Sequence, residues 1–331
     1  MSWTSLAVLL GASALLSIAL VPWVRRLALA WGAVDVPDPN KITVRTTARL
    51  GGLAVLLSSA TVLAVASAFG RVSLTVAPPK VAPFALGALL VAGVGAFDDF
   101  RRLRPLSKLA VEIVAALIVV VAGDCRIGGF SSPGGVVGLG SLAVPFTVVW
   151  IVLVTNAVNL IDGIDGLAAG TSAIALVTIG VIARGFGFPT VTAFAAVLVG
   201  ACLGFLVFNV HPASIFLGDT GSLLLGFSIG VLSSYARAKG STGAITLGTL
   251  LIVALPLGDT MFAIRRRYFR GLAPRSLRSH VAGFTRILQP DRNHLHHRLL
   301  RLGLGHRGAA WALFAIQAAA CAYAVYLLVS R

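Results

Sequence analysis

Apolar stretches of roughly 15 to 22 residues recur along the whole chain, and short polar segments separate them. A helix needs about 20 apolar residues to cross the roughly 30 Å hydrocarbon layer of a membrane. The stretches do not alternate with period two, so the pattern favours helices over strands. It predicts ten membrane-spanning helices, at residues 4–24, 50–69, 81–97, 108–122, 142–160, 166–183, 190–209, 221–236, 244–264 and 309–329.

Positive charge is unevenly distributed over the loops between these spans. If the chain alternates between the two sides, 20 of its 27 Lys and Arg residues lie in the first, third, fifth, seventh and ninth loops. Positive residues concentrate on the cytoplasmic side of membrane proteins. We therefore expect these five loops on the cytoplasmic face and both termini outside. Loop charge also explains the net charge of +16 without nucleic-acid binding.

The composition agrees with a membrane protein. Hydrophobic residues make up 57% of the chain and charged residues 11%, whereas soluble domains average about 45–50% and about 25%. The three cysteines show no CxxC spacing, so the sequence indicates neither a disulfide framework nor a zinc site. We expect an all-α polytopic membrane helical bundle, one integral membrane domain over residues 1–331 with five cytoplasmic catalytic loops. In the Gly-, Ser- and Pro-rich segment 123–140 we expect a loop or a short hairpin.

Acidic residues gather on the predicted cytoplasmic face, where eight of the eleven lie in or beside loops. A site for a divalent cation and a phosphorylated substrate would require such clustering. Asp98 and Asp99 directly follow the third span, and two adjacent carboxylates repel each other unless a cation neutralises them. They are either a metal ligand or general base, or two solvated acids that end a helix. Lys108, at the start of the next span, can reach back to hold a phosphate.

A second polar group crosses the end of the fifth span, where Asn156, Asn159, Asp162 and Asp165 recur every three residues. At this spacing the positions drift slowly around one helical face, so all four can face one cavity. Polar residues inside a membrane are costly and usually face a cavity. The alternative is a polar seam between helices; we favour a functional site.

Two further motifs are polar. Phe-Leu-Gly-Asp-Thr-Gly-Ser at 216–222 precedes the eighth span. This motif either supplies a carboxylate for a cation and backbone N–H groups for phosphate, or forms a short structural loop.

Three of the six histidines lie within 291–298. Their spacing is compatible with zinc, but no Cys or Glu lies nearby to complete four ligands. We interpret them, with Arg298, as donors to phosphate oxygens.

In this order, the motifs resemble those of the polyprenyl-phosphate N-acetylhexosamine-1-phosphate transferases, a glycosyltransferase 4 family. The resemblance runs over about residues 32–307 and includes Gly-Ala-Val-Asp at 32–35 and Arg-Leu-Gly-Gly at 49–52. Thr43 stands where many members have His, and two prolines of the family pattern are replaced. The histidine segment is more similar to that of the N-acetylglucosamine branch than to the contiguous histidines of the related muramoyl-pentapeptide branch.

The resemblance implies transfer of N-acetylhexosamine 1-phosphate, above all N-acetylglucosamine 1-phosphate, from the UDP-sugar to undecaprenyl (polyprenyl) phosphate, with release of UMP. It implies that Asn159 and Asp219 bind Mg²⁺, for which Mn²⁺ can substitute. It also implies that Asp165 reads the uracil and that Phe216 stacks on it. The other residues expected to bind substrate are Lys41, Asn156, His294 and Arg298. The residues expected to act in catalysis are Asp98, Asp99, Lys108, Asp162, His296 and His297.

From the aspartate pair at the membrane surface we hypothesise that Asp98 deprotonates the lipid phosphate and that Asp99 supports Asp98 or the metal. A covalent aspartyl intermediate is the alternative, and the sequence does not separate the two. The expected partners are a UDP-N-acetylhexosamine and a polyprenyl phosphate lipid; a homodimer is one open arrangement. We expect a multi-pass protein of the plasma (inner) membrane with its active site on the cytoplasmic face, at the first membrane step of a cell-envelope polysaccharide pathway.

Three other functions remain open. A phospho-N-acetylmuramoyl-pentapeptide transferase would use related motifs. A CDP-alcohol phosphatidyltransferase shares an Asp-Gly-rich motif, but the Ala-Arg that ends its motif is absent here. An ion-coupled membrane transporter would carry acids near the bilayer midplane, often within inverted repeats, whereas most acids here lie at span ends.

Overall fold

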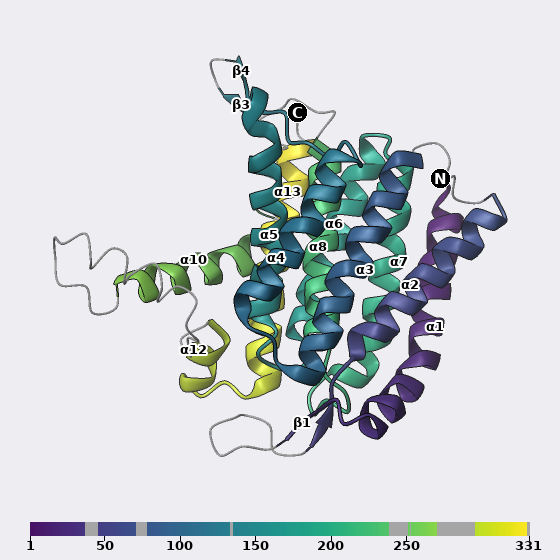
Figure 1. Ribbon diagram of the computed structural model, residues 1–331, viewed down its shortest axis with the longest axis vertical. Helices are drawn as coiled ribbons and strands as arrows, with labels where there is room; N and C mark the ends of the chain where they lie inside the picture. Colours follow the sequence, from purple (N-terminus) through teal and green to yellow (C-terminus); the bar gives the residue numbers. More distant parts are fainter. Residues whose placement is uncertain are drawn as a thin grey trace.

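The computed structural model describes residues 1–36, 46–70, 78–132, 135–237, 251, 253–269 and 295–329. Its main helices stand side by side in one bundle (Figure 1). They are α1 (Trp3–Ala30), α2 (Gly51–Ala68), α3 (Pro78–Arg101), α4 (Pro105–Val121), α5 (Ala143–Ile161), α6 (Leu167–Gly185), α7 (Pro189–Asn209), α8 (Gly218–Arg237), α10 (Ala254–Phe269), α12 (Leu295–Arg301) and α13 (His306–Val329). The predicted all-α polytopic membrane bundle is confirmed.

The helices agree with the predicted spans in order and position, but not in every boundary. Within the described residues, seven helices are long and apolar enough to cross a membrane. The helices α4 and α10, with 17 and 16 residues, fall below that length, and much of the predicted ninth span, 244–250 and 252, lies outside the described residues. The count of ten spans therefore stays a prediction. Two helices run past their predicted ends, α1 to Ala30 and α3 to Arg101, because polar residues at a membrane surface can continue a helix.

One end of the bundle carries β1 (Val34–Asp35) and β2 (Thr47–Ala48), which pair antiparallel (Figure 1). Ala48 also bridges to Ile215, and its carbonyl accepts from the N–H of Phe216 at 2.8 Å. The first two N–H groups of α2, which a helix cannot satisfy internally, donate to the carbonyls of Phe216 and Leu217 at 3.0 and 2.8 Å. The first loop is therefore fixed against the segment that precedes α8.

The opposite end carries β3 (Gly129–Ser132) and β4 (Gly135–Gly138), an antiparallel pair. Of the two forms expected for 123–140, the hairpin is confirmed. The helix α1 begins and α13 ends at this same end of the bundle (Figure 1). Which end faces the cytoplasm stays a prediction.

Small residues let α8 pack closely against its neighbours. A Cβ atom on Gly52 of α2 would lie 2.1 Å from the backbone nitrogen of Gly221, and one on Gly95 of α3 would lie 2.4 Å from the carbonyl oxygen of Asp219. Backbones that approach this closely are typical of helix contacts in membranes. The first turn of α8 is thus held between α2 and α3, which fixes the position of Asp219.

Candidate functional site

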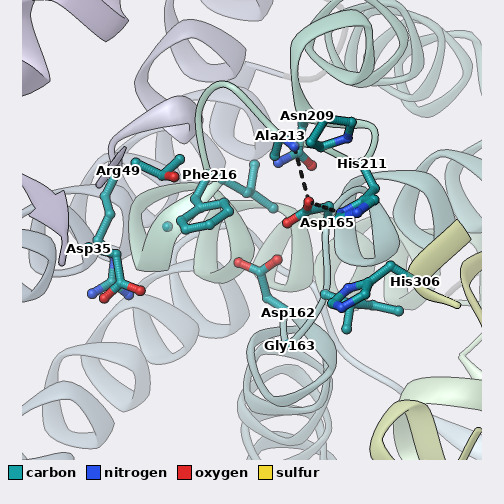
Figure 2. Close-up of a pocket in the computed structure, with 15 residues that line it drawn as sticks. Asp35, Arg49, Asp162, Gly163, Asp165, Asn209, His211, Ala213, Phe216 and His306 are labelled. Carbon is teal, nitrogen blue, oxygen red and sulfur yellow. Dashed lines mark hydrogen bonds and ion pairs between the residues drawn. The ribbon is translucent and has the colours of Figure 1, made fainter. Parts of the chain in front are cut away.

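A cavity of about 480 Å³ opens at the end of the bundle that carries β1 and β2. Figure 2 shows Arg49 and Asp35 on one side of it, His211 and His306 on the other, and Phe216 between them. Five segments far apart in sequence contribute to its wall. The lining residues are Asp35, Thr47, Arg49, Asp162, Gly163, Ile164, Asp165, Asn209, His211, Pro212, Ala213, Phe216, Leu217, Gly218 and His306.

Asp165 lies in this wall, in the turn between α5 and α6, with one oxygen fully engaged. Its Oδ2 lies 2.7 Å from Nδ1 of His211 and accepts from the backbone N–H of Ala213 at 3.0 Å (Figure 2). No described residue donates to its Oδ1. The carboxylate is therefore held in one orientation and keeps an acceptor for a ligand N–H group.

The turn that carries Asp165 is itself fixed by Asn209, the last residue of α7. Its Oδ1 accepts from the N–H of Gly166 at 3.0 Å, and its Nδ2 donates to the carbonyl of Ile215 at 2.9 Å. Gly166 has φ +77°, a conformation that glycine adopts without strain. One buried amide thus joins the start of α6 to the segment that carries Phe216.

Asp162 caps the C-terminus of α5 and lines the cavity between Phe216 and Gly163 (Figure 2). Among the described residues, none hydrogen-bonds to its carboxyl group. Burial, followed by the negative charge of Asp219, raises the pKa of Asp162 to about 8. A cation bound beside it would favour the ionised form.

A cluster of charged groups lies beside the cavity, at the first turn of α8. Nζ of Lys108 lies 2.7 Å from Oδ2 of Asp219 and 3.3 Å from Oδ2 of Asp98. Oδ1 of Asp98 accepts from the backbone N–H of Leu103 at 2.6 Å, which fixes the turn after α3. Three residues from α3, α4 and α8 that the sequence proposed for catalysis or metal binding are therefore brought together around one ammonium group.

Asp99 faces away from the cavity and holds the N-terminus of α8. Its side chain is fully buried. It accepts from the backbone N–H of Asp219 at 3.0 Å, the backbone N–H of Thr220 at 3.0 Å and the hydroxyl of Thr220 at 2.7 Å. A carboxylate at this place satisfies the free N–H groups of the helix and complements its dipole. Asp99 therefore positions Asp219.

The fit of a metal ion can be tested on the donors that converge here. Nδ2 of Asn159 donates to Ser222 at 2.9 Å, and no described residue donates to its Oδ1. Oxygen ligands of this kind suit Mg²⁺, and the ammonium of Lys108 between Asp98 and Asp219 shows that the place accommodates a cation. Among the described residues, no three His, Cys, Asp or Glu side chains are placed so that they could hold a metal ion together. An ion held by Asp219 and Asn159 would complete its shell with water and phosphate oxygens, as Mg²⁺ usually does.

The expectation that four polar residues face one cavity holds for Asp162 and Asp165; Asn156 and Asn159 do not line it. Nδ2 of Asn156 donates to Glu112, which is 2% exposed, and to the carbonyl of Val152 at 3.0 Å. The physical reason is depth: Asn156 lies about one and a half turns, roughly 8 Å, inside the end of α5 at Ile161, whereas Asp162 and Asp165 lie beyond that end. The pairing of Glu112 inside the bundle is as expected.

The histidine segment is only partly described. The short helix α12 begins where the N–H of Leu295 donates to Oδ1 of the buried Asp259 at 2.9 Å. His297 is half-buried and Arg298 exposed, and neither lines the cavity. Lys41, His294 and the side chain of His296 lie outside the described residues.

Sequence reasoning missed two histidines of the site. The rings of His211 and His306 stack with centroids 4.5 Å apart and planes at 10°, and Nε of Arg307 donates to the carbonyl of His211 at 2.9 Å. The start of α13 therefore supports the residue that anchors Asp165. The sequence signal that could have identified His211 as a site residue is its position five residues before Phe216, in the same loop.

Comparisons with known proteins show which family the sequence is similar to. The family model described as glycosyl transferase family 4 matches residues 81–237. A Bacillus subtilis protein named "Probable undecaprenyl-phosphate N-acetylglucosaminyl 1-phosphate transferase" is 37% identical over 92% of this chain and 80% of its own. A decaprenyl-phosphate N-acetylglucosaminephosphotransferase of Mycolicibacterium smegmatis is 36% identical over 88% of this chain and 74% of its own. A phospho-N-acetylmuramoyl-pentapeptide-transferase of Halalkalibacterium halodurans is 34% identical over 68% of this chain and 72% of its own.

Proposed function

The chain belongs to glycosyl transferase family 4, and from this membership and the geometry of its site we propose that it transfers N-acetylglucosamine 1-phosphate from UDP-N-acetylglucosamine to a polyprenyl phosphate, releasing UMP. The observation that carries the proposal is the convergence of Asp98, Lys108 and Asp219 beside a cavity walled by Asp165 and Phe216. A nucleotide diphosphate needs an aromatic surface for its base and, next to it, charged groups that can hold a cation and the phosphates.

The uridine would occupy the aromatic side of the cavity. Oδ1 of Asp165 would accept from the uracil N3–H, because His211 and Ala213 hold Oδ2 and leave Oδ1 available. Phe216, half-buried in the wall, offers a ring face for stacking. A carboxylate acceptor discriminates against a cytosine base, which has no proton at N3.

The diphosphate would lie toward the first turn of α8. Asp219 and Asn159 would hold Mg²⁺ there, which supplies positive charge to two anions that must approach each other. Lys108 adds an ammonium on the same side and holds the carboxylates of Asp98 and Asp219 at 3.3 and 2.7 Å. Catalysis of this kind is mainly positioning and charge stabilisation.

In the reaction an oxygen of the lipid phosphate attacks the β-phosphorus of the UDP-sugar. A new P–O bond forms there, and the bond to the oxygen shared with the α-phosphorus breaks, so that UMP leaves with that oxygen. Asp98 would take the proton of the lipid phosphate, since Asp99 is engaged with α8 and cannot reach substrate.

The lipid substrate and the soluble one meet at the membrane boundary, which agrees with a site at one end of the bundle (Figure 1). This multi-pass membrane protein would lie in the plasma membrane, with the site on the cytoplasmic face. N-acetylglucosamine is proposed over the muramoyl pentapeptide because the Bacillus subtilis relative named for it is 37% identical over 92% of the chain, whereas the Halalkalibacterium halodurans relative named for the pentapeptide is 34% identical over 68%.

The decisive experiment uses purified protein with undecaprenyl phosphate, Mg²⁺ and a panel of UDP-sugars, with release of UMP as the readout. We expect UMP only when lipid acceptor, Mg²⁺ and UDP-N-acetylglucosamine are all present. Release of UMP from the UDP-muramoyl-pentapeptide alone would show that this sugar nucleotide, and not UDP-N-acetylglucosamine, is the substrate. Uptake of labelled substrate into proteoliposomes without UMP release would show that the protein is a transporter.

A further inference from the structure

Arg49 lies in the wall of the cavity with its backbone fixed on both sides. Its N–H donates to the carbonyl of Ala33 at 2.9 Å, and the N–H of Gly51, two residues on, donates to the carbonyl of Phe216 at 3.0 Å. The side chain is 25% exposed and lines the side of the cavity opposite His211 (Figure 2). The chain therefore presents this side chain from a rigid support.

The guanidinium group of Arg49 has donors to spare. Its Nε lies 3.5 Å from Oδ1 of Asp99, an ion pair without a hydrogen bond. Asp99 already accepts three hydrogen bonds from Asp219 and Thr220. Among the described residues, no atom accepts a hydrogen bond from the Arg49 side chain, although a guanidinium carries five N–H donors.

The charges of the cavity explain why these donors matter. Asp35 and Asp165 line it and would repel a diphosphate, as would Asp162 when it is ionised. Of the described lining residues, Arg49 is the one with a permanent positive charge, since His211 and His306 carry imidazoles. Lys108 does not line the cavity. The planar guanidinium also matches two phosphate oxygens at once.

Given the proposed function, on which this step rests, we propose that Arg49 binds the diphosphate of the sugar nucleotide through its free N–H groups. Asp99, behind it, keeps the guanidinium turned toward the cavity. The competing explanation is that Arg49 only neutralises the buried charge of Asp99 and never touches a ligand.

The test compares the binding of uridine, UMP and UDP to purified protein in detergent with Mg²⁺ present, by calorimetry. In the wild type we expect affinity to increase from uridine to UDP. In Arg49→Met we expect UDP to bind about 10- to 100-fold more weakly, the effect of one lost charge-assisted contact, with uridine changed less than about twofold. Arg49→Lys should bind UDP with intermediate affinity. Arg101→Met removes the same charge from an exposed site at the end of α3 and serves as the control.

Two results would overturn the inference. The first is unchanged UDP binding in Arg49→Met. The second is an equal loss of affinity for uridine and UDP in that variant, which would show that Arg49 has only a structural role. A wild-type protein that binds neither uridine nor UDP would instead overturn the proposed function, and this inference with it.

Discussion

The two sides of the site are held in place by different forces. On the nucleoside side, Asp165 is fixed by a histidine and a backbone N–H group, and Asn209 joins the two segments around it. On the phosphate side, Asp98 and Asp219 are held by the charge of Lys108. Hydrogen bonds and packing preform the first side. On the second they fix the first turn of α8 and the orientation of Asp98, but cations are also needed to offset the repulsion between the carboxylates. Recognition and reaction should therefore fail separately when either side is changed.

The largest effect is expected for Asp219→Asn on the phosphate side. The change keeps the shape but removes the charge that Lys108 and Mg²⁺ share, so Mg²⁺-dependent turnover should fall by at least on the order of 10³-fold. UMP release measures it, and uridine binding should be unchanged. An active variant would remove Asp219 from the metal site.

The next effect is expected for Asp98→Asn, which removes the proposed base. We expect kcat to fall roughly 10²-fold, the lower end for loss of a general base, with KM for the sugar nucleotide unchanged. A phosphorylated enzyme trapped with UDP-sugar in the absence of lipid would instead establish a covalent intermediate and contradict direct attack.

On the nucleoside side, His211→Ala should raise KM rather than lower kcat. Without its partner at 2.7 Å, the carboxylate of Asp165 loses its fixed orientation, and we expect KM for the UDP-sugar to rise about 10-fold, as for other supporting residues. His306→Ala, which removes the stacking on His211 and one side chain of the cavity wall, should raise KM by a smaller factor, about twofold to fivefold. A fall in kcat at constant KM would show that the two sides are not separable.

The smallest effect on turnover is expected for Thr220→Val. It removes one of the three hydrogen bonds to the buried Asp99, which should lower the free energy of unfolding by about 1–2 kcal/mol. Thermal unfolding in detergent measures this, while kcat should change only a few-fold. Ser228→Ala, on α8 but bonded only to the carbonyl of Leu224, is the matched control.

The sequence predicted well whatever depends on local pattern. Apolar length predicted the helices, and the clustering of acids in loops predicted that Asp98 and Asp219 meet although 121 positions separate them, as the shared contact with Lys108 shows. The prediction for Asn156 was wrong because it considered only the direction of the side chains, whereas each step of three residues also moves the position about 4.5 Å along the helix axis.

What the sequence could not predict depends on packing between distant segments. The pairing of His211 with Asp165 and the stacking of His306 on His211 arise only once α13 and the segment before α8 lie together. The sequence suggested a base at Asp98 and a supporting role at Asp99 but not the contacts of either, and a helix places neighbours about 100° apart. One therefore faces Lys108 while the other meets the backbone of α8.

This difference between adjacent aspartates decides how inactive variants can be interpreted. Asp99 accepts three hydrogen bonds from α8, so even Asn at this position would place an NH₂ group or a weaker acceptor against backbone N–H groups. The variant would be inactive because the start of α8, and the carboxylate of Asp219 with it, would be displaced. A mutational screen that measures activity alone would then classify Asp99 as a catalytic residue, although its role is structural.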